Sequence, residues 1–328
     1  MATQPTPERA ESFAELHRAL ARNLGQVIQG KDDAIDLVLL GLVAEGHVLV
    51  EDVPGVGKTT LAKALARSID GSYGRIQFTP DLLPSDVVGV NVWDRGSGRF
   101  DFRQGPVFAN VVLADEINRA SPKTQSALLE AMAERQVTID GTTRPLPPPF
   151  LVIATQNPIE NEGTFPLPES QLDRFLLKVT VGYPGRDAEL DMLATHGDHD
   201  PLADLRPVVS AAQVSAMAAA ARTVHVAPAL QGYLVDLANA SRAHPNVSVG
   251  VSPRATLALQ RVARARAATR GRAYATPDDV KALAVPVLAH RLVRSPAARV
   301  GQVTAEAIIE DLLATVPQPA PRPVHPAG

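Results

Sequence analysis

The chain of 328 residues has an ordinary composition, with 45% hydrophobic residues, 20% charged residues and a formal net charge of −3. This near-neutral balance does not favour a protein that binds polyanions or membrane surfaces, and the length predicts about two domains. Cysteine is absent, which excludes disulfides and thiolate metal sites, and the eight histidines show no paired ligand spacing.

The N-terminal part predicts a flexible start, over residues 1–10, followed by two helices. The start has no apolar stretch of the signal-peptide type. The apolar run at 35–50 is interrupted by charged residues and is too polar to span a bilayer, so we expect a cytoplasmic protein. Apolar residues recur at helical spacing over 11–29 and again over 31–45, which predicts the two helices.

The stretch Glu51–Thr60 lies between a short β-branched strand pattern and a helical pattern. It predicts a phosphate-binding loop, because its glycines let successive N–H groups point into one concavity that the new helix makes more positive. Lys58 would reach the β- and γ-phosphates, and the Thr59 hydroxyl would bind Mg²⁺. The loop residues expected to bind nucleotide are Pro54, Gly55, Val56, Gly57, Lys58, Thr59 and Thr60.

One position departs from the general phosphate-loop pattern. The pattern G-x-x-x-x-G-K-[ST] places glycine at position 52, where this chain has Asp52, so only its second half is intact. Gly55 can supply the missing flexibility, and a glycine-containing turn with a chance lysine is the alternative. The upstream pair Gln29-Gly30 could hold the nucleotide base or form an ordinary turn between helices.

Two hairpins are predicted as inserts. Alternating runs joined by a glycine-rich turn predict the first near 89–103, after a strand at 73–78. A helix that begins at Ser121 leads to the second, near 136–145, where an Asp-Gly pair favours a type I′ turn. The first hairpin, with its tryptophan, could contact another subunit or a substrate, or it could be a surface loop.

Polar side chains follow the buried strands that come after the loop. Asp115 and Glu116 end the strand pattern at 111–114, where Asp115 can hold Mg²⁺ through water and Glu116 can activate the attacking water as a general base. Asn157 ends the next strand pattern, at 150–155, and either hydrogen-bonds the γ-phosphate or the lytic water or forms an Asx turn before proline.

Two arginines are further candidates. Arg174 precedes the last strand pattern, at 176–181, so we expect it at the sheet edge and acting across a subunit boundary; a salt bridge to a nearby acid is the alternative. Arg254 lies in the first turn of a helix, where a cation opposes the helix dipole. It is either aimed at a bound phosphate or is a surface arginine.

Beyond Tyr183 the pattern is helical, which predicts a second, smaller all-α domain over 185–316 and a disordered proline-rich tail over 317–328. The predicted helices are 186–196, 210–221, 227–243, 253–270 and 276–290. The helix at 253–270 carries a basic stripe, and because no aromatic residues are interleaved with it we favour a solvated or interface face over a nucleic-acid site. The stripe consists of Arg261, Arg264, Arg266 and Arg270.

The order of these motifs resembles that of the AAA+ ATPases, and several longer stretches resemble the MoxR family in particular. The stretches are 51–59, 114–120, 154–158 and 171–175. The resemblance implies an α/β fold, a P-loop NTPase αβα sandwich with a parallel sheet over 11–184, followed by a small all-α lid over 185–316. The family's loop tolerates a residue other than glycine at position 52. The hairpins resemble inserts that project toward the ring pore or a bound client in relatives.

The resemblance also implies a function. It implies ATP hydrolysis with Mg²⁺ at the subunit interfaces of a ring, most often a hexamer, with Arg174 as the arginine finger and Arg254 as a phosphate sensor on the lid. The implied role is chaperone-like: remodelling or activating partner proteins, often ones with a von Willebrand factor A domain, in complex assembly or metal-cofactor insertion. A nucleic-acid-dependent motor and a nucleotide-controlled scaffold are alternatives, and Glu116 argues against the scaffold.

Overall fold

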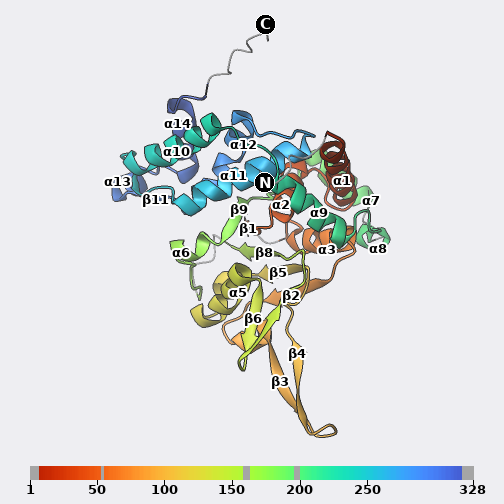
Figure 1. The fold of residues 1–328 in the computed structure, drawn as a ribbon. Helices are drawn as coiled ribbons and strands as arrows, with labels where there is room; N and C mark the ends of the chain where they lie inside the picture. Colours follow the sequence, from red (N-terminus) through yellow and green to blue (C-terminus); the bar gives the residue numbers. More distant parts are fainter. Residues whose placement is uncertain (1–6, 53–54, 158–162, 196–199, 320–328) are drawn as a thin grey trace.

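The computed structural model describes residues 7–52, 55–157, 163–195 and 200–319. Five parallel strands form the central sheet, in the order β2-β5-β8-β1-β9 (Figure 1). Their bounds are β1 (His47–Glu51), β2 (Tyr73–Gln77), β5 (Val111–Asp115), β8 (Leu151–Gln156) and β9 (Phe175–Val179). Because all five run the same way, their carboxyl ends meet at one edge of the sheet and their amino ends at the other.

Alternate residues of these strands point to opposite faces, and helices cover both faces. Val48 and Val50 of β1 belong to the hydrophobic cluster shared with α1 (Pro7–Gly25), α2 (Asp32–Val43) and α3 (Lys58–Ser68). Leu49, between them, points to the opposite face and belongs to the second hydrophobic cluster, which two other helices cover. These are α4 (Pro84–Val88) and α5 (Pro122–Glu134), the latter capped by the predicted Ser121. The predicted αβα sandwich with a parallel sheet is confirmed.

Both predicted hairpins are present, and Figure 1 shows that they project from the end of the molecule opposite the lid. The first pairs β3 (Gly89–Asp94) with β4 (Arg99–Gln104), and the second pairs β6 (Gln136–Ile139) with β7 (Thr142–Pro145). Asp140 and Gly141 have φ values of 48° and 76°, as a type I′ turn requires. An Asn91–Asp140 hydrogen bond of 2.6 Å joins the two hairpins.

The lid is helical, as predicted, with one short ribbon that the sequence pattern did not indicate. Its helices are α7 (Arg186–Thr195), α8 (Pro201–Asp204), α9 (Ala211–Arg222), α10 (Pro228–Ala243), α11 (Pro253–Thr269), α12 (Pro277–Leu288), α13 (Pro296–Val300) and α14 (Ala305–Thr315). The ribbon pairs β10 (Val247–Val249) with β11 (Val293–Arg294). Among the helices that the structure describes, none has the length and apolar character to cross a membrane.

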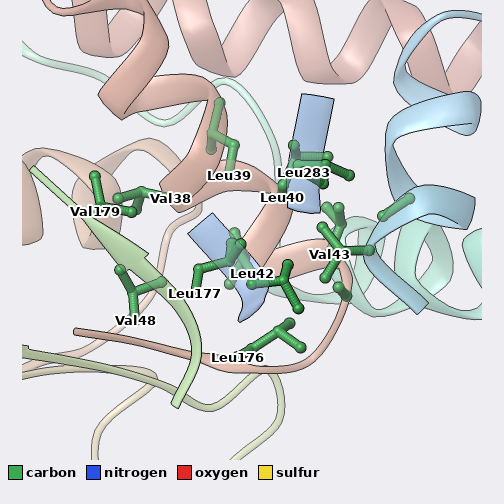
Figure 2. Close-up of a cluster of buried hydrophobic side chains, with 14 of the residues drawn as sticks. Val38, Leu39, Leu40, Leu42, Val43, Val48, Leu176, Leu177, Val179 and Leu283 are labelled. Atoms are coloured by element: carbon green, nitrogen blue, oxygen red, sulfur yellow. The ribbon is translucent and has the colours of Figure 1, made fainter. Parts of the chain in front are cut away.

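Helix α2 packs against both the sheet and the lid. Figure 2 shows its apolar side chains packed with those of β1, of β9 and of Leu283 from α12. At Gly41 the strand lies so close that a Cβ atom would meet Val48 Cγ2 at 2.7 Å. One hydrophobic cluster therefore runs from the sheet through α2 into the lid.

Candidate nucleotide site

The predicted phosphate-binding loop connects β1, which ends at Glu51, with α3, which begins at Lys58. Gly55 and Gly57 have φ values of 85° and 88°, which L side chains rarely adopt, so both positions require glycine. Val56 packs against the hydrophobic cluster behind the loop. The loop thus has the backbone conformation and the helix N-terminus that a phosphate needs. Pro54 lies outside the described residues.

Asp52 closes the base of this loop. It is only 6% exposed, and its carboxylate accepts hydrogen bonds from the backbone N–H groups of Val181, at 2.7 Å, and Gly182. Its backbone carbonyl accepts a 3.0 Å hydrogen bond from Lys58 Nζ. Asp52 does not have a positive φ, so the backbone here does not require glycine. The aspartate that replaces glycine at this position therefore connects the loop to the residues that follow β9.

Asp115 and Glu116 lie at the carboxyl end of β5. Asp115 Oδ2 pairs with Arg75 Nη2 at 2.9 Å, and Asp115 Oδ1 accepts a hydrogen bond from the Thr155 hydroxyl at 2.7 Å. Glu116 has a φ of 57°, a conformation that costs energy for a non-glycine residue and is often found at functional sites. The Glu116 N–H group donates to Thr155 Oγ1 at 2.9 Å. Thr155 therefore holds both acidic residues.

The side chain of Glu116 is held by two further groups. Its Oε2 atom accepts from Gln77 Nε2 at 3.1 Å and pairs with Arg119 Nε at 3.2 Å. Sequence reasoning missed Arg75, Gln77 and Thr155 as parts of the site. The alternation of β2 could have indicated the first two, because residues 75 and 77 share one face and the register places Gln77 beside Asp115.

The residues present fit Mg²⁺ and a nucleotide phosphate. An anionic oxygen of Asp115 and the hydroxyl of Thr59 are ligands that Mg²⁺ prefers, and Mg²⁺ usually takes only one or two carboxylates together with substrate phosphates. The loop N–H groups and Lys58 are suited to the phosphates themselves. Asn157 directly follows β8, whose last residue, Gln156, pairs with Glu51 at the end of β1. It therefore lies at the same edge as the acidic pair.

The turn at Gln29-Gly30 also lies near the loop. Ile28 packs behind Gly57, where a Cβ would be 3.8 Å from its Cδ1 atom. Lys31, which directly follows the turn, donates through Nζ to the carbonyl of Tyr183 at 2.5 Å. This position is compatible with the predicted base-binding turn, whose role stays a prediction.

Arg174 lies at the other end of the sheet. It immediately precedes β9, and the register pairs Phe175 with His47, the first residue of β1, whereas the phosphate loop follows the last. A strand of five residues separates the two ends by roughly 16 Å at about 3.3 Å per residue. Arg174 Nη1 donates to the carbonyl of Leu129 at 3.0 Å. Arg174 therefore lies away from the phosphate loop of its own chain.

Arg254 lies beside Arg174 rather than at its own phosphate loop. Its Nε atom is 3.6 Å from Asp173 Oδ2, and the two arginines line one cavity of about 200 Å³ together with Arg261 and Arg291. We expected Arg254 to sense a phosphate from the lid; the structure puts it at the edge that Arg174 occupies.

Known proteins share this architecture. The family model "ATPase family associated with various cellular activities (AAA)" matches residues 47–177, and the AAA lid domain model matches residues 239–312. The sequence is 42% identical to Chaperone MoxR1 of Mycobacterium tuberculosis over 100% of this chain and 89% of that protein. This chain belongs to the MoxR family of AAA+ ATPases. The resemblance inferred from the sequence motifs is confirmed.

Two further proteins match over similar lengths. This MoxR-family chain is 47% identical to YeaC of Bacillus subtilis, over 94% of this chain and 97% of that protein. A crystal structure of a proposed ATPase from Cytophaga hutchinsonii matches with a TM-score of 0.89 and 38% identity, covering 94% of this chain and 97% of that one. These matches span both the sheet and the lid.

Proposed function

We propose that this protein hydrolyses ATP at sites shared between neighbouring subunits of a hexameric ring and uses the cycle to remodel or activate partner proteins. The observation that carries the proposal is the separation of the two halves of the site. The phosphate loop and the acidic pair lie at one edge of the sheet, and Arg174 and Arg254 lie at the other.

Within one subunit, Lys58 and the loop N–H groups would hold the phosphates, and Thr59 and Asp115 would hold Mg²⁺. When bound, Mg²⁺ would neutralise the charge that develops on the phosphates. Glu116 would take the proton of the attacking water, and Asn157 would position that water. Gln77 and Thr155 keep the acidic pair in place through the hydrogen bonds described above.

The neighbouring subunit would supply the positive charge that the transition state needs. An arginine that reaches a transferring phosphoryl group is worth about 10³–10⁵ in kcat. Since Arg174 and Arg254 line one cavity, we assign both to the neighbour's nucleotide. This revises the lid-sensor role of Arg254 implied by the family resemblance.

Mixed assemblies test the shared site. Subunits with Glu116→Gln keep their arginines but lose the general base, and subunits with Arg174→Ala keep the base but lose the arginine. Each variant alone should be nearly inactive, and mixing them should restore phosphate release, because some interfaces then combine an intact base with an intact arginine. Absence of recovery at every mixing ratio would contradict a shared site.

The first hairpin is the segment that we assign to the client. Trp93 and Phe100 face each other across β3 and β4 with ring centroids 5.1 Å apart, yet they are 52% and 67% exposed. Exposed aromatic pairs of this kind are common at protein interfaces. A partner with a von Willebrand factor A domain, in complex assembly or metal-cofactor insertion, fits the family role, and we place the reaction in the cytoplasm.

A pull-down tests the client surface. The Glu116→Gln protein, held with ATP, should capture a set of partners that the Glu116→Gln protein with Trp93→Ala and Phe100→Ala does not. Replacing Val300, which is exposed in the lid, by serine is a control for loss of apolar surface. Capture of the same partners by the hairpin variant would contradict the assignment.

The contacts that the arginines of the basic stripe make within the chain favour the chaperone role over a nucleic-acid motor. Arg266 Nε is 3.6 Å from Asp279 Oδ1, and Arg264 Nη1 donates to the carbonyl of Arg222 at 3.4 Å. Two of the four arginines are thus engaged within the chain. DNA or RNA should therefore leave ATP hydrolysis unchanged, whereas strong stimulation that falls steeply with salt would favour the motor.

A further inference from the structure

Arg291 is a buried arginine of the lid that the proposed mechanism does not use. It ends the short 3₁₀ segment η2 (Ala289–Arg291) after α12 and is only 9% exposed. Buried arginines are rare unless they are paired. Each nitrogen of this guanidinium has an acceptor, and most of the acceptors belong to the start of β9 and the residues before it.

These acceptors lie on both sides of Arg174. On one side, Arg291 Nε donates to Asp173 Oδ1 at 2.8 Å. On the other side, Arg291 Nη2 donates to the carbonyl of Phe175 at 2.7 Å, and Arg291 Nη1 to that of Leu176 at 3.3 Å. One planar side chain thus holds the backbone immediately before and immediately after Arg174.

Two further hydrogen bonds fix the position of Arg291 and of the backbone that it binds. Its Nη1 atom also donates to the Val287 carbonyl in the last turn of α12, which anchors the guanidinium to the helix that precedes η2. His290 Nε2 donates to the carbonyl of Phe175 at 3.1 Å and adds a second bond from η2. Figure 2 shows the following residues of the chain, Leu176 and Leu177, packed among the side chains of α2.

Asp173 extends the connection to Arg254. Its Oδ1 atom is bound by Arg291, and its Oδ2 atom is 3.6 Å from Arg254 Nε. A single carboxylate, one residue before Arg174, therefore joins the start of α11 and the end of η2. Arg174 directly precedes a strand of the sheet and Arg254 belongs to the lid, so this carboxylate is a polar link between the segments that carry the two arginines.

We propose that Arg291 is a positioning residue that holds Arg174 and Arg254 in one fixed arrangement on the face presented to the neighbouring subunit. The inference rests on the proposed function. The guanidinium suits this role because its rigid fork binds several acceptors in fixed directions, which a lysine cannot do. A displacement of the lid would then move both arginines together.

The first test compares three variants. Arg291→Met should lower kcat by about 10- to 100-fold, since a misplacement of about 1 Å at a reacting centre can cost about 10²-fold, while the Kd for ATP changes by less than about twofold. Arg291→Lys should recover part of kcat, because it keeps the charge but not the fork. Arg294→Met is the matched control: Arg294 Nη1 donates to the carbonyl of Val303 at 3.0 Å and not to the residues that flank Arg174, so kcat should stay at the wild-type value.

A second test separates positioning from folding. When Arg291→Met subunits are mixed with Glu116→Gln subunits, phosphate release should rise above the sum of the two separate activities. The Arg291→Met subunit keeps its own phosphate loop and general base, and it receives arginines from its Glu116→Gln neighbour. A subunit that has lost its fold would not recover in this way. In the double variant Arg174→Ala with Arg291→Met, the loss of kcat should be smaller than the product of the two separate losses, because part of the effect of Arg291 acts through Arg174, which is already absent.

The outcomes distinguish this inference from the proposed function. If Arg174→Ala recovers with Glu116→Gln but Arg291→Met does not, the positioning role is overturned and the shared site stands. Multiplicative losses in the double variant would overturn the positioning role in the same way. If neither pair recovers, the shared site is wrong and the inference falls with it.

Discussion

The two edges of one parallel sheet differ in what they hold and in how they hold it. At the carboxyl edge, the ends of the strands and the phosphate loop place Lys58, Asp115 and Glu116, and the supporting bonds come from the sheet itself, through Thr155 and Gln77. At the amino edge, the contacts of Asp173 with Arg291 and Arg254 cross from the lid to the residue before Arg174. The difference teaches that the sheet alone can build the nucleotide edge, whereas the arginine edge needs the lid.

The largest effects should separate the two edges by the kinetic quantity that each controls. Arg174→Ala should lower kcat by about 10³–10⁵ without changing the Kd for ATP, because in the proposed shared site Arg174 acts only on the transition state of the neighbouring subunit. Lys58→Ala should instead raise the Kd, because it removes a contact to the bound phosphates. Phosphate release and the binding of a fluorescent ATP analogue measure the two quantities. A loss of ATP binding in Arg174→Ala would assign that residue to folding.

Acid should weaken the arginine edge of the sheet. Burial lowers the pKa of His47 to about 4, and burial lowers the pKa of His290 to about 3. His47 Nε2 donates to the Met132 carbonyl at 3.1 Å and its Nδ1 accepts from Val152 N at 3.0 Å, while His290 donates to Phe175 beside Arg174. Both rings are therefore neutral in the folded protein.

The unfolded chain binds these protons below a pKa of about 6.5, so the free energy of unfolding is highest above that pH and falls as the pH drops toward 4. Each histidine should make the free energy of unfolding about 2 kcal/mol lower at pH 5 than at pH 7.5. Urea unfolding at the two pH values measures the loss. His47→Gln offers a matching donor and acceptor that do not titrate, and it should reduce the loss of unfolding free energy between pH 7.5 and pH 5 by about 2 kcal/mol; an unchanged dependence would contradict the assignment.

The smallest effect should come from Arg75 at the nucleotide edge. Its pair with Asp115 is half exposed on the arginine side, and exposed ion pairs contribute at most about 1 kcal/mol. Arg75→Met should therefore lower the Mg²⁺ concentration for half-maximal ATP hydrolysis by no more than about fivefold, because Asp115 no longer has a competing partner. Titration of hydrolysis with Mg²⁺ measures this shift, with Arg99→Met in the first hairpin as a control. An increase in the Mg²⁺ requirement would show that Arg75 supports the site instead.

Much of the fold was predictable because its signals are local. The strand ending in Asp115, the turn at Asp140 and the cap at Ser121 each depend on a few neighbouring residues, and the structure confirms all three. Arg75 and Gln77 were not predicted as parts of the site, because their role depends on which strand lies beside β5. The catalytic and binding roles of the individual residues stay predictions.

The sequence by itself determined the family, the fold class and the phosphate loop, because motif spacing and hydrophobic periodicity are properties of the chain in order. Only the tertiary structure decided where the lid meets the sheet. It showed that Asp52 ties the loop to Val181 and that Arg254 lies beside Arg174. It also showed that Arg291 reaches across 118 positions to Asp173. Contacts between residues so distant in sequence follow from packing, which no local pattern encodes.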